Sequence, residues 1–212
     1  MPLLRVYFLS IVSPLTACIC LGQAVSVGVV GGIRTTNDLS GGFVATSESK
    51  RYVVGPALNI GLPFSLGIEV DALYRREGFR VNGISDERAN SWEFPLLIKY
   101  NLPFPVIKPF IEAGYAPRWI QGTERTNYVL ILPQPLHASG SVFGGTNWPV
   151  SQGFVAGGGV QFGIGRLLVA PAVRYTYWNN TPIVGVFSGG GPSWQSTQNQ
   201  VDILVGIAWK IK

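Results

Sequence analysis

The sequence lacks most of the residues that build metal centres and nucleophilic active sites. Its 212 residues include two cysteines, Cys18 and Cys20, and one histidine, His137. No Cys/His spacing typical of a metal site is present, so we expect no metal and no cofactor. The Gly-Gly-Gly runs at 157–159 and 189–191 are not followed by the Gly-Lys-Ser/Thr of a phosphate-binding loop.

Charge is also scarce in this chain. Asp, Glu, Lys and Arg make up 13% of the residues, against about a quarter in soluble domains. The net charge of +5 is small and the basic residues are scattered, without the cluster that a nucleic-acid-binding surface needs. We therefore expect no nucleic-acid partner.

A long apolar run is found only at the N-terminus. Residues 1–24 combine the positive Arg5 with an apolar core and small residues near Ala24, which is typical of an export signal cleaved after Ala24. Two alternatives stay open: an uncleaved anchor, and lipidation at Cys18, which follows Leu-Thr-Ala. Cleavage after Ala24 leaves a mature domain, 25–212, without cysteine, so disulfides could not hold the exported protein together.

The remaining sequence has strand-like periodicity and almost no helix-like periodicity. Eight runs of alternating character are separated by Gly, Pro, Asn and Ser, at 25–34, 51–61, 66–79, 91–101, 110–121, 152–162, 167–178 and 198–210. Long and short connections alternate strictly between these runs. In an up-and-down array, this puts all long connections at one end and both termini at the other. The pattern predicts an all-β, eight-stranded antiparallel transmembrane β-barrel with long outer loops and short periplasmic turns.

Alternate residues of the runs form one apolar face and one face of Gly, Ala and charge. We expect the apolar face to meet lipid, because each charge near mid-depth on a lipid-facing wall costs up to about 2–4 kcal/mol. A soluble, lipocalin-like barrel is the alternative, but it would place the large apolar residues inside. The predicted lumen charge network contains nine residues: Glu69, Asp71, Arg75, Glu93, Lys99, Glu112, Arg118, Arg174 and Asp202.

The spacing of these charges also predicts strand register, because directly opposed residues of an antiparallel pair have a constant index sum. Lys99 with Glu112 and Glu93 with Arg118 share one sum, and Glu69 with Lys99 and Arg75 with Glu93 share another. Two charge rows with alternating signs would then cross three strands, Glu69–Lys99–Glu112 and Arg75–Glu93–Arg118. An eight-stranded interior is just wide enough to be filled by such side chains.

Aromatic residues are predicted to form two girdles at the membrane interfaces. Those expected at the long-loop end are Tyr52, Tyr74, Trp92, Trp119, Phe154 and Tyr177, and those expected at the short-turn end are Tyr100, Phe110, Phe162 and Trp209. Four prolines oppose the assignment, because proline cannot donate to a ladder and a closed barrel has no edge strand. We expect local bulges at Pro56, Pro95, Pro117 and Pro171.

The chain resembles the small outer-membrane β-barrel family, the OmpA/OmpX-like and PorT-like barrel-domain proteins. The resemblance is carried by "VSVGVVGGIR", "LGIEVDALYRR", "SWEFPLLIKY", "PFIEAGYAPRW" and the closing "NQVDILVGIAWKIK", and it implies the bacterial outer membrane as location. The C-terminus is similar to the signal that the barrel-assembly machinery reads, with Gly206, Trp209 and Ile211 in the matching positions. It departs from that signal because Lys212 follows the last apolar residue and Leu204 stands where a polar residue is usual.

The expected function is a structural or interaction role. The partners would be outer-membrane lipid, the assembly machinery during insertion, and an extracellular ligand or protein bound by the outer loops. A narrow pore or conduit for small solutes is the alternative. Some small barrels are lipid A-modifying enzymes that use His with Ser and a carboxylate, and here only His137, near Ser139 and Ser141, could serve. A lone loop histidine is a weak signal, so we expect no enzyme and no catalytic residue.

Overall fold

The computed structural model describes residues 24–40, 45–81, 85–104, 107–127, 150–179, 184–185 and 194–211. Among these residues, no helix is long and apolar enough to cross a membrane. The proposed export signal before Ala24 and the histidine at 137 lie outside the described residues, and so does the catalytic alternative built on that histidine.

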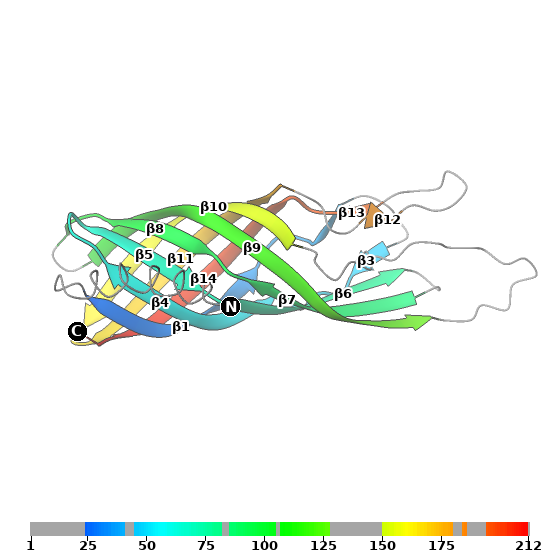
Figure 1. The fold of residues 1–212 in the computed structure, drawn as a ribbon, viewed down its shortest axis with the longest axis horizontal. Coiled ribbons are helices and arrows are strands. Elements are labelled where there is room, and N and C mark those ends of the chain that lie inside the picture. Colours follow the sequence, from blue (N-terminus) through cyan, green and yellow to red (C-terminus); the bar gives the residue numbers. More distant parts are fainter. Residues whose placement is uncertain are drawn as a thin grey trace, which may run out of the picture.

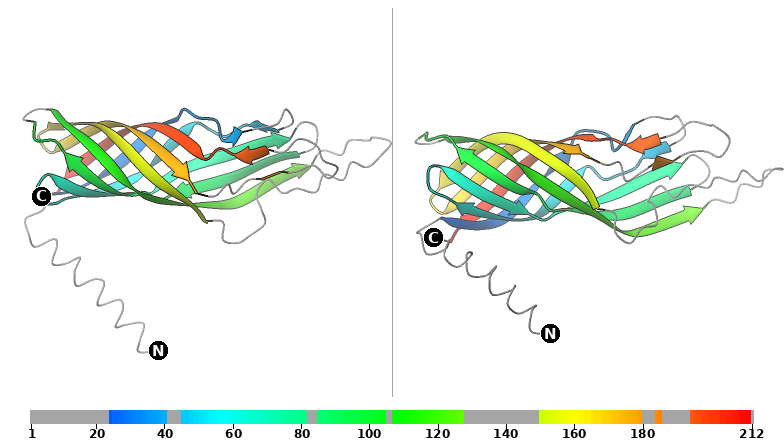
Figure 2. Two further views of the ribbon diagram at one scale, coloured as in Figure 1. Left: turned by 90° about the horizontal axis from the view of Figure 1, so that it is seen from above. Right: turned by 45° about the horizontal axis from the view of Figure 1, so that its top comes forward.

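Antiparallel strands form one closed barrel (Figures 1 and 2). Starting from β1, the wall runs through β4, β5 with β6, β8 with β7, β9, β10, β11 and β14, and β14 pairs again with β1. The wall therefore has eight strands, as the sequence predicts. The bounds are β1 Val25–Arg34, β4 Tyr52–Gly61, β5 Leu66–Asp71, β6 Leu73–Val81, β7 Ser85–Glu93, β8 Leu96–Asn101, β9 Ile107–Asn127, β10 Val150–Ile164, β11 Leu167–Trp178 and β14 Asn199–Lys210.

Three wall strands continue well beyond the barrel on its long-loop side. β6, β7 and β9 project together in Figure 1, and β3 (Ala45–Ser47) pairs with β6 at the edge of this extension. A separate small sheet is formed by β2 (Leu39–Ser40), β12 (Val184–Gly185) and β13 (Trp194–Ser196). The predicted runs 91–101 and 110–121 are therefore too short. Strand-forming residues continue into what the sequence pattern assigns to loops, because neighbouring strands supply hydrogen-bond partners there.

Two wall strands are interrupted, and both interruptions lie opposite prolines. β5 and β6 are separated at Ala72, whose N–H donates to the carbonyl of Pro56 in β4. β7 and β8 are separated at Phe94–Pro95, and the N–H of Phe94 donates to the carbonyl of Pro117 in β9. Each proline lacks the N–H that would return the second ladder bond, so the ladder is weakest at these two points.

The expectation of bulges at the four prolines is wrong for the described strands. The register is the same on both sides of Pro95, where Glu93 faces Arg118 and Leu96 faces Tyr115, and the register shift of this wall lies between Arg88 and Asn90. The register stays continuous through Pro56 against β1 and through Pro117 against β10, and it is also continuous at Pro171 between β11 and β14. Only Pro95 lies in a break between strands. A closed wall tolerates the other prolines because each removes one donor toward a single neighbour and leaves the other neighbour's ladder intact.

The short turns reverse the chain in a left-handed backbone conformation. Gly165 has φ +62° between β10 and β11, which suits glycine at the first central position of a tight hairpin turn. Between β4 and β5, by contrast, Phe64 and Ser65 have φ of 61° and 63°. Two consecutive positive φ values match a type I′ turn, which normally takes Asn-Gly. This turn is therefore strained by its own residues.

Candidate functional site: the barrel lumen

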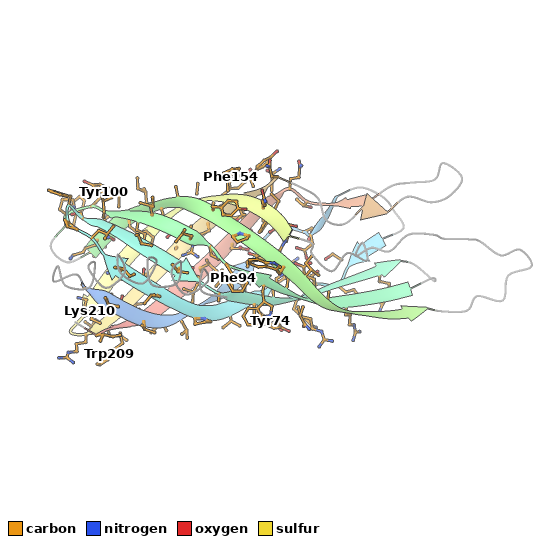
Figure 3. The ribbon with its side chains drawn as sticks, in the orientation of Figure 1. Tyr74, Phe94, Tyr100, Phe154, Trp209 and Lys210 are labelled. Atoms are coloured by element: carbon orange, nitrogen blue, oxygen red, sulfur yellow. The ribbon has the colours of Figure 1, made fainter. Side chains whose placement is uncertain are left out.

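The wall has an apolar exterior and a charged interior. In β8, Ile98 is 63% exposed on the outside, whereas the next residue, Lys99, is 6% exposed on the inside. All nine predicted lumen charges are buried, and Figure 3 shows side chains projecting outward along the wall. A continuous apolar cylinder of this kind is stable in lipid and would aggregate in water, which excludes the lipocalin-like alternative.

Two clusters of charge lie in the lumen, and the one nearer the short-turn end is called the lower cluster. It is centred on Arg174 of β11. Its Nε donates to Glu112 Oε1 at 2.5 Å and its Nη1 to Asp71 Oδ2 at 2.6 Å, and its Nη2 pairs with Glu69. Lys99 pairs with Glu69 and lies 3.6 Å from Glu112 Oε2. Because β5 lies on the opposite side of the barrel from β11, the pairs of Arg174 with Glu69 and Asp71 cross the lumen.

A glycine makes room for this cluster. Gly157 in β10 lies between Glu112 and Arg174 in the register. A Cβ added there would lie 3.0 Å from Glu112 Oε1 and 2.7 Å from the Val173 carbonyl oxygen. The first glycine of the 157–159 run thus permits the close approach of a guanidinium and a carboxylate.

The second cluster, called the upper cluster, lies nearer the long-loop end and is centred on Arg34 at the end of β1. Arg34 Nη2 donates to Glu93 Oε1 at 2.9 Å, and Arg34 Nε donates to Asp202 Oδ1 at 2.7 Å. Arg118 Nη1 lies 3.6 Å from Glu77 Oε1 and 3.9 Å from Glu93 Oε1. The pair between β1 and β7 again crosses the lumen, because those strands are not neighbours in the wall.

Apolar side chains separate the two clusters. One group lies on the β8, β9, β10 and β11 side and contains Leu97, Ala116, Val155 and Trp178. The facing group contains Val30, Val53, Ala57, Leu73 and Leu204. The Trp178 ring lies beneath the Arg118 guanidinium, 3.9 Å from its Cζ, and its Nε1 donates to Gln200 at 2.5 Å. From the middle of the wall to its long-loop end, the lumen is therefore filled by the lower charge cluster, then by apolar side chains, and then by the upper charge cluster.

Three buried charges of the network are absent from the sequence-based set: Arg34, Asp38 and Glu77. Arg34 and Glu77 continue the inward-facing alternation of β1 and β6, so the period-two pattern could have found both. Asp38 follows the end of β1, beyond the alternating run, and carries no such signal. It pairs with Arg75 at 2.5 Å.

Asp38 is held in its ionised form by its neighbours. Burial alone would raise the pKa of this carboxyl, but the guanidinium groups of Arg75 and Arg34 outweigh burial and lower the pKa below its ordinary value. Because Asp38 lies in the connection beyond β1, it links the outer connection to the lumen network.

The register confirms half of the predicted charge rows. Lys99 faces Glu112 and Glu93 faces Arg118, as predicted. The other register is wrong by two residues: Leu97 faces Glu69, and Leu73 faces Glu93. A shift of two keeps every side chain on its own face, so alternation could not detect the error. Lys99 still reaches Glu69 diagonally.

A further correction concerns the girdle at the short-turn end. Phe110 is 2% exposed and points into the lumen, where Lys99 Nζ lies 4.2 Å from its ring centre. Tyr100 and Trp209 do lie on the exterior at this end, while Tyr74 and Phe154 lie further along the wall (Figure 3). Phe110 shares the inward face of β9 with Glu112, so its closeness to the turn does not place it in the girdle.

Below the lower cluster, the lumen contains a cavity of about 660 Å³. Glu69, Lys99 and Arg174 line its inner end, and small residues such as Ser26 and Gly206 line its walls. Residues at the start of β1 and the end of β14 contribute to it, including Ala24 and Lys210. The cavity therefore belongs to the short-turn half of the barrel, and the ion pairs of Arg174 close it toward the outer half.

The remaining predicted site residues lie at the end of β14. Gly206 faces the lumen, and Trp209 and Ile211 are exposed. Their recognition by the assembly machinery stays a prediction. Among the residues that the structure describes, no group of three or more His, Cys, Asp or Glu side chains could hold a metal ion.

The fold matches solved outer-membrane barrels. The outer-membrane protein OprG from Pseudomonas aeruginosa superposes with a TM-score of 0.57 at 12% identity, over 89% of this chain and 95% of that one. The chain has the fold of the small outer-membrane β-barrels. Neisserial surface protein A superposes with a TM-score of 0.51 at 12% identity, over 90% and 97% of the two chains. No protein-family model matches the sequence, and no curated protein is similar to it in sequence.

Proposed function

We propose that this chain is an integral protein of the bacterial outer membrane with a closed, non-conducting and non-catalytic barrel. Its role is to anchor the outer strands and connections, which contact an extracellular ligand or protein. The barrel fold and the apolar exterior support the membrane location. In this proposal, lipid and the barrel-assembly machinery are the partners during and after insertion.

The observation that carries the closed-barrel proposal is the pairing of charges across the lumen. Arg174 connects β11 to β5 and β9, and Arg34 connects β1 to β7. A continuous water path would require both sets of buried ion pairs to separate, which costs about 3–5 kcal/mol for each stranded partner. The cavity on the short-turn side of Arg174 is then a blind vestibule.

Planar-bilayer recording tests the closed barrel against the narrow-pore alternative. We expect no steady openings from the purified, refolded protein. The double variant Arg174→Ala/Lys99→Ala removes the cationic partners of the lower cluster and should open only flickering, low-conductance events. Steady wild-type openings, of a size that this variant changes, would establish the pore and overturn the closed-barrel proposal.

The projecting strands β6, β7 and β9 support an interaction role outside the cell. An epitope inserted between Val81 and Ser85, in the connection between β6 and β7, should be labelled by antibody on intact cells. The same epitope after Lys212 should be labelled only after the outer membrane is permeabilised. The reverse labelling pattern would show that the barrel lies in the membrane in the opposite orientation and would contradict the proposal.

A further inference from the structure

We propose that the cavity below the lower cluster binds a small organic carboxylate with one apolar group, which enters from the short-turn end. This inference goes beyond the proposed function and rests on it only for the closed inner end of the cavity. It is carried by two lysines without an ionic partner at the mouth of the cavity and by an apolar strip along one of its walls.

The lining of the cavity carries more positive than negative charge. Its charged residues are four cations and one carboxylate: Lys99, Lys108, Arg174, Lys210 and Glu69. Lys99 and Arg174 are already paired with carboxylates of the lower cluster. Lys108 and Lys210 form no ion pair with any residue that the structure describes. The two lysines are therefore the cations that can attract an anionic ligand.

Both lysines lie at β10, at the mouth of the cavity. Lys108 of β9 faces Gln161 of β10 in the register. A Cβ added to Gly163, two residues further along β10, would lie 3.9 Å from Lys210 Nζ. Because β11 lies between β10 and β14, the Lys210 side chain reaches past β11 inside the lumen. Two ammonium groups that approach β10 from opposite sides can bind the two oxygens of one carboxylate.

The inner end of the cavity keeps the charge of the ligand at this mouth. The lower cluster contains the three carboxylates of Glu69, Asp71 and Glu112 and only two cations, Lys99 and Arg174. A second anion beside this cluster would be repelled, because like charges interact strongly where water is scarce. Figure 3 shows Lys210 at the short-turn end of the barrel, away from that cluster.

Neutral polar side chains complete the charged end of the site. A row of facing residues runs from Lys210 through Ser26 and Asn59 to Glu69. The side chains of Asn59 and Gln161 line the cavity and have no hydrogen-bond partner among the described residues. Such groups bind water in the free protein, and their amide N–H groups can donate to a carboxylate that displaces it.

The wall formed by β11 and β14 supplies the apolar strip. Three pairs of facing residues line the cavity there: Leu168 with Ala208, Ala170 with Gly206, and Ala172 with Leu204. Four residues of a strand span about 13 Å, enough for a ring or a short chain. The strip is hollow at Gly206, where an added Cβ would meet nothing nearer than 3.7 Å. The cavity of about 660 Å³ also falls within the range of small-molecule pockets, about 300–1,000 Å³.

Matched charge variants test the role of the two lysines. Lys108→Gln/Lys210→Gln removes both cations from the mouth, whereas Lys50→Gln/Arg166→Gln removes two exposed cations that do not line the cavity. The probe is 3-phenylpropionate, titrated calorimetrically into the refolded protein in phosphatidylcholine nanodiscs. We expect the first variant to bind about tenfold less tightly for each lysine removed and the second to match the wild type.

A steric variant and a neutral probe separate binding in the cavity from ion pairing at the rim. Ala170→Leu fills the apolar strip and keeps both lysines, so it should weaken the binding of 3-phenylpropionate by about tenfold. The neutral analogue 3-phenylpropan-1-ol should bind the wild type at least about tenfold less tightly than the acid. It should bind Lys108→Gln/Lys210→Gln as it binds the wild type.

Three results would overturn the inference. They are equal binding of the acid by both charge variants, equal binding of acid and alcohol by the wild type, and loss of acid binding when phosphatidylglycerol is added to the nanodiscs, which would assign the lysines to lipid headgroups. The comparison of acid with alcohol needs no variant, and the heat-dependent gel shift shows whether each variant folds. Bilayer recording without the probe tests the closed barrel separately, because steady openings would overturn the proposed function and leave the titration result intact.

Discussion

At the scale of single residues, the lumen depends on a few charges whose removal leaves others buried without a partner. Arg174 pairs with three carboxylates at once. Breaking a buried pair by removing one partner costs more than the pair contributes, because the remaining charge keeps its desolvation cost. The clusters therefore specify which strands face each other across the lumen, in addition to any stability they supply.

Replacing Arg174 with methionine tests this dependence. Arg174→Met keeps an unbranched side chain but removes the guanidinium and its charge, and we expect it to lower the free energy of unfolding by about 3–5 kcal/mol. The fraction of heat-shifted, folded barrel across a urea series measures the change. Arg166→Met in the exposed β10–β11 turn is the control and should stay within about 0.5 kcal/mol of the wild type. Equal midpoints for both variants would contradict the network.

The space beside Arg174 gives a second prediction. Gly157→Ala places a methyl group against Glu112 and the Val173 carbonyl, so we expect a loss of about 1–3 kcal/mol. Gly31→Ala is the matched control, because its added Cβ meets nothing nearer than 3.9 Å and should leave stability unchanged or raised. Urea titration of the gel shift compares the two variants, and a stable Gly157→Ala barrel would show that the cluster can rearrange.

At the scale of elements, the strands tolerate breaks where proline removes a donor, and the turns differ in strain. The interruptions at Ala72 and Phe94 each lie opposite a proline of the next strand. The β10–β11 turn uses glycine at its positive φ, whereas the β4–β5 turn uses Phe64 and Ser65. Side chains with a Cβ adopt this conformation at a cost of about 1–2 kcal/mol each.

The strained turn should be improved by residues that prefer its geometry. We expect Phe64→Asn/Ser65→Gly to raise the free energy of unfolding by about 1 kcal/mol per residue. Gly165→Ala in the unstrained β10–β11 turn should instead lower the free energy of unfolding. The added Cβ would meet no atom within 4 Å, so the positive φ of this position is the cause. Both are measured by urea unfolding in detergent. A destabilised Phe64→Asn/Ser65→Gly barrel would show that Phe64, which is 90% exposed, contributes through a contact of its own.

At the scale of the whole molecule, the barrel has its charged side chains inside and its apolar side chains outside, the reverse of the arrangement in a water-soluble globular protein. Charges that are buried inside a barrel of this width lose most of their contact with water, so they must neutralise one another. The exterior belt between the two aromatic girdles must then stay free of charge along its whole height.

A lysine on the lipid-facing wall tests this belt by its depth. Ile98→Lys lies between the girdles and should cost about 2–4 kcal/mol, whereas Ile164→Lys at the short-turn end should cost about 0–1 kcal/mol. Both isoleucines are exposed, at 63% and 72%, so burial alone does not separate them. Folding yield in lipid vesicles, followed by the gel shift, measures the difference. Equal yields would place Ile98 away from the lipid core.

Much of this architecture could be read from the sequence because alternation is a local property. Period-two patterning determined the number of wall strands, the face of each predicted charge and the alternation of short and long connections. The same pattern contained Arg34 and Glu77 of the network. Where alternation was set aside, as for Phe110, the assignment was wrong.

Only the tertiary structure decided which charges meet. The two-residue offset between β5 and β8 is invisible to a pattern that repeats every two residues. The pairs of Arg174 with Asp71 and of Arg34 with Glu93 cross the lumen between strands that are not neighbours, so no hairpin arithmetic contains them. The extension of β9 to Asn127 likewise depends on partner strands. Local alternation determines whether a side chain points into the lumen or toward lipid, while closure of the barrel determines which side chains it contacts.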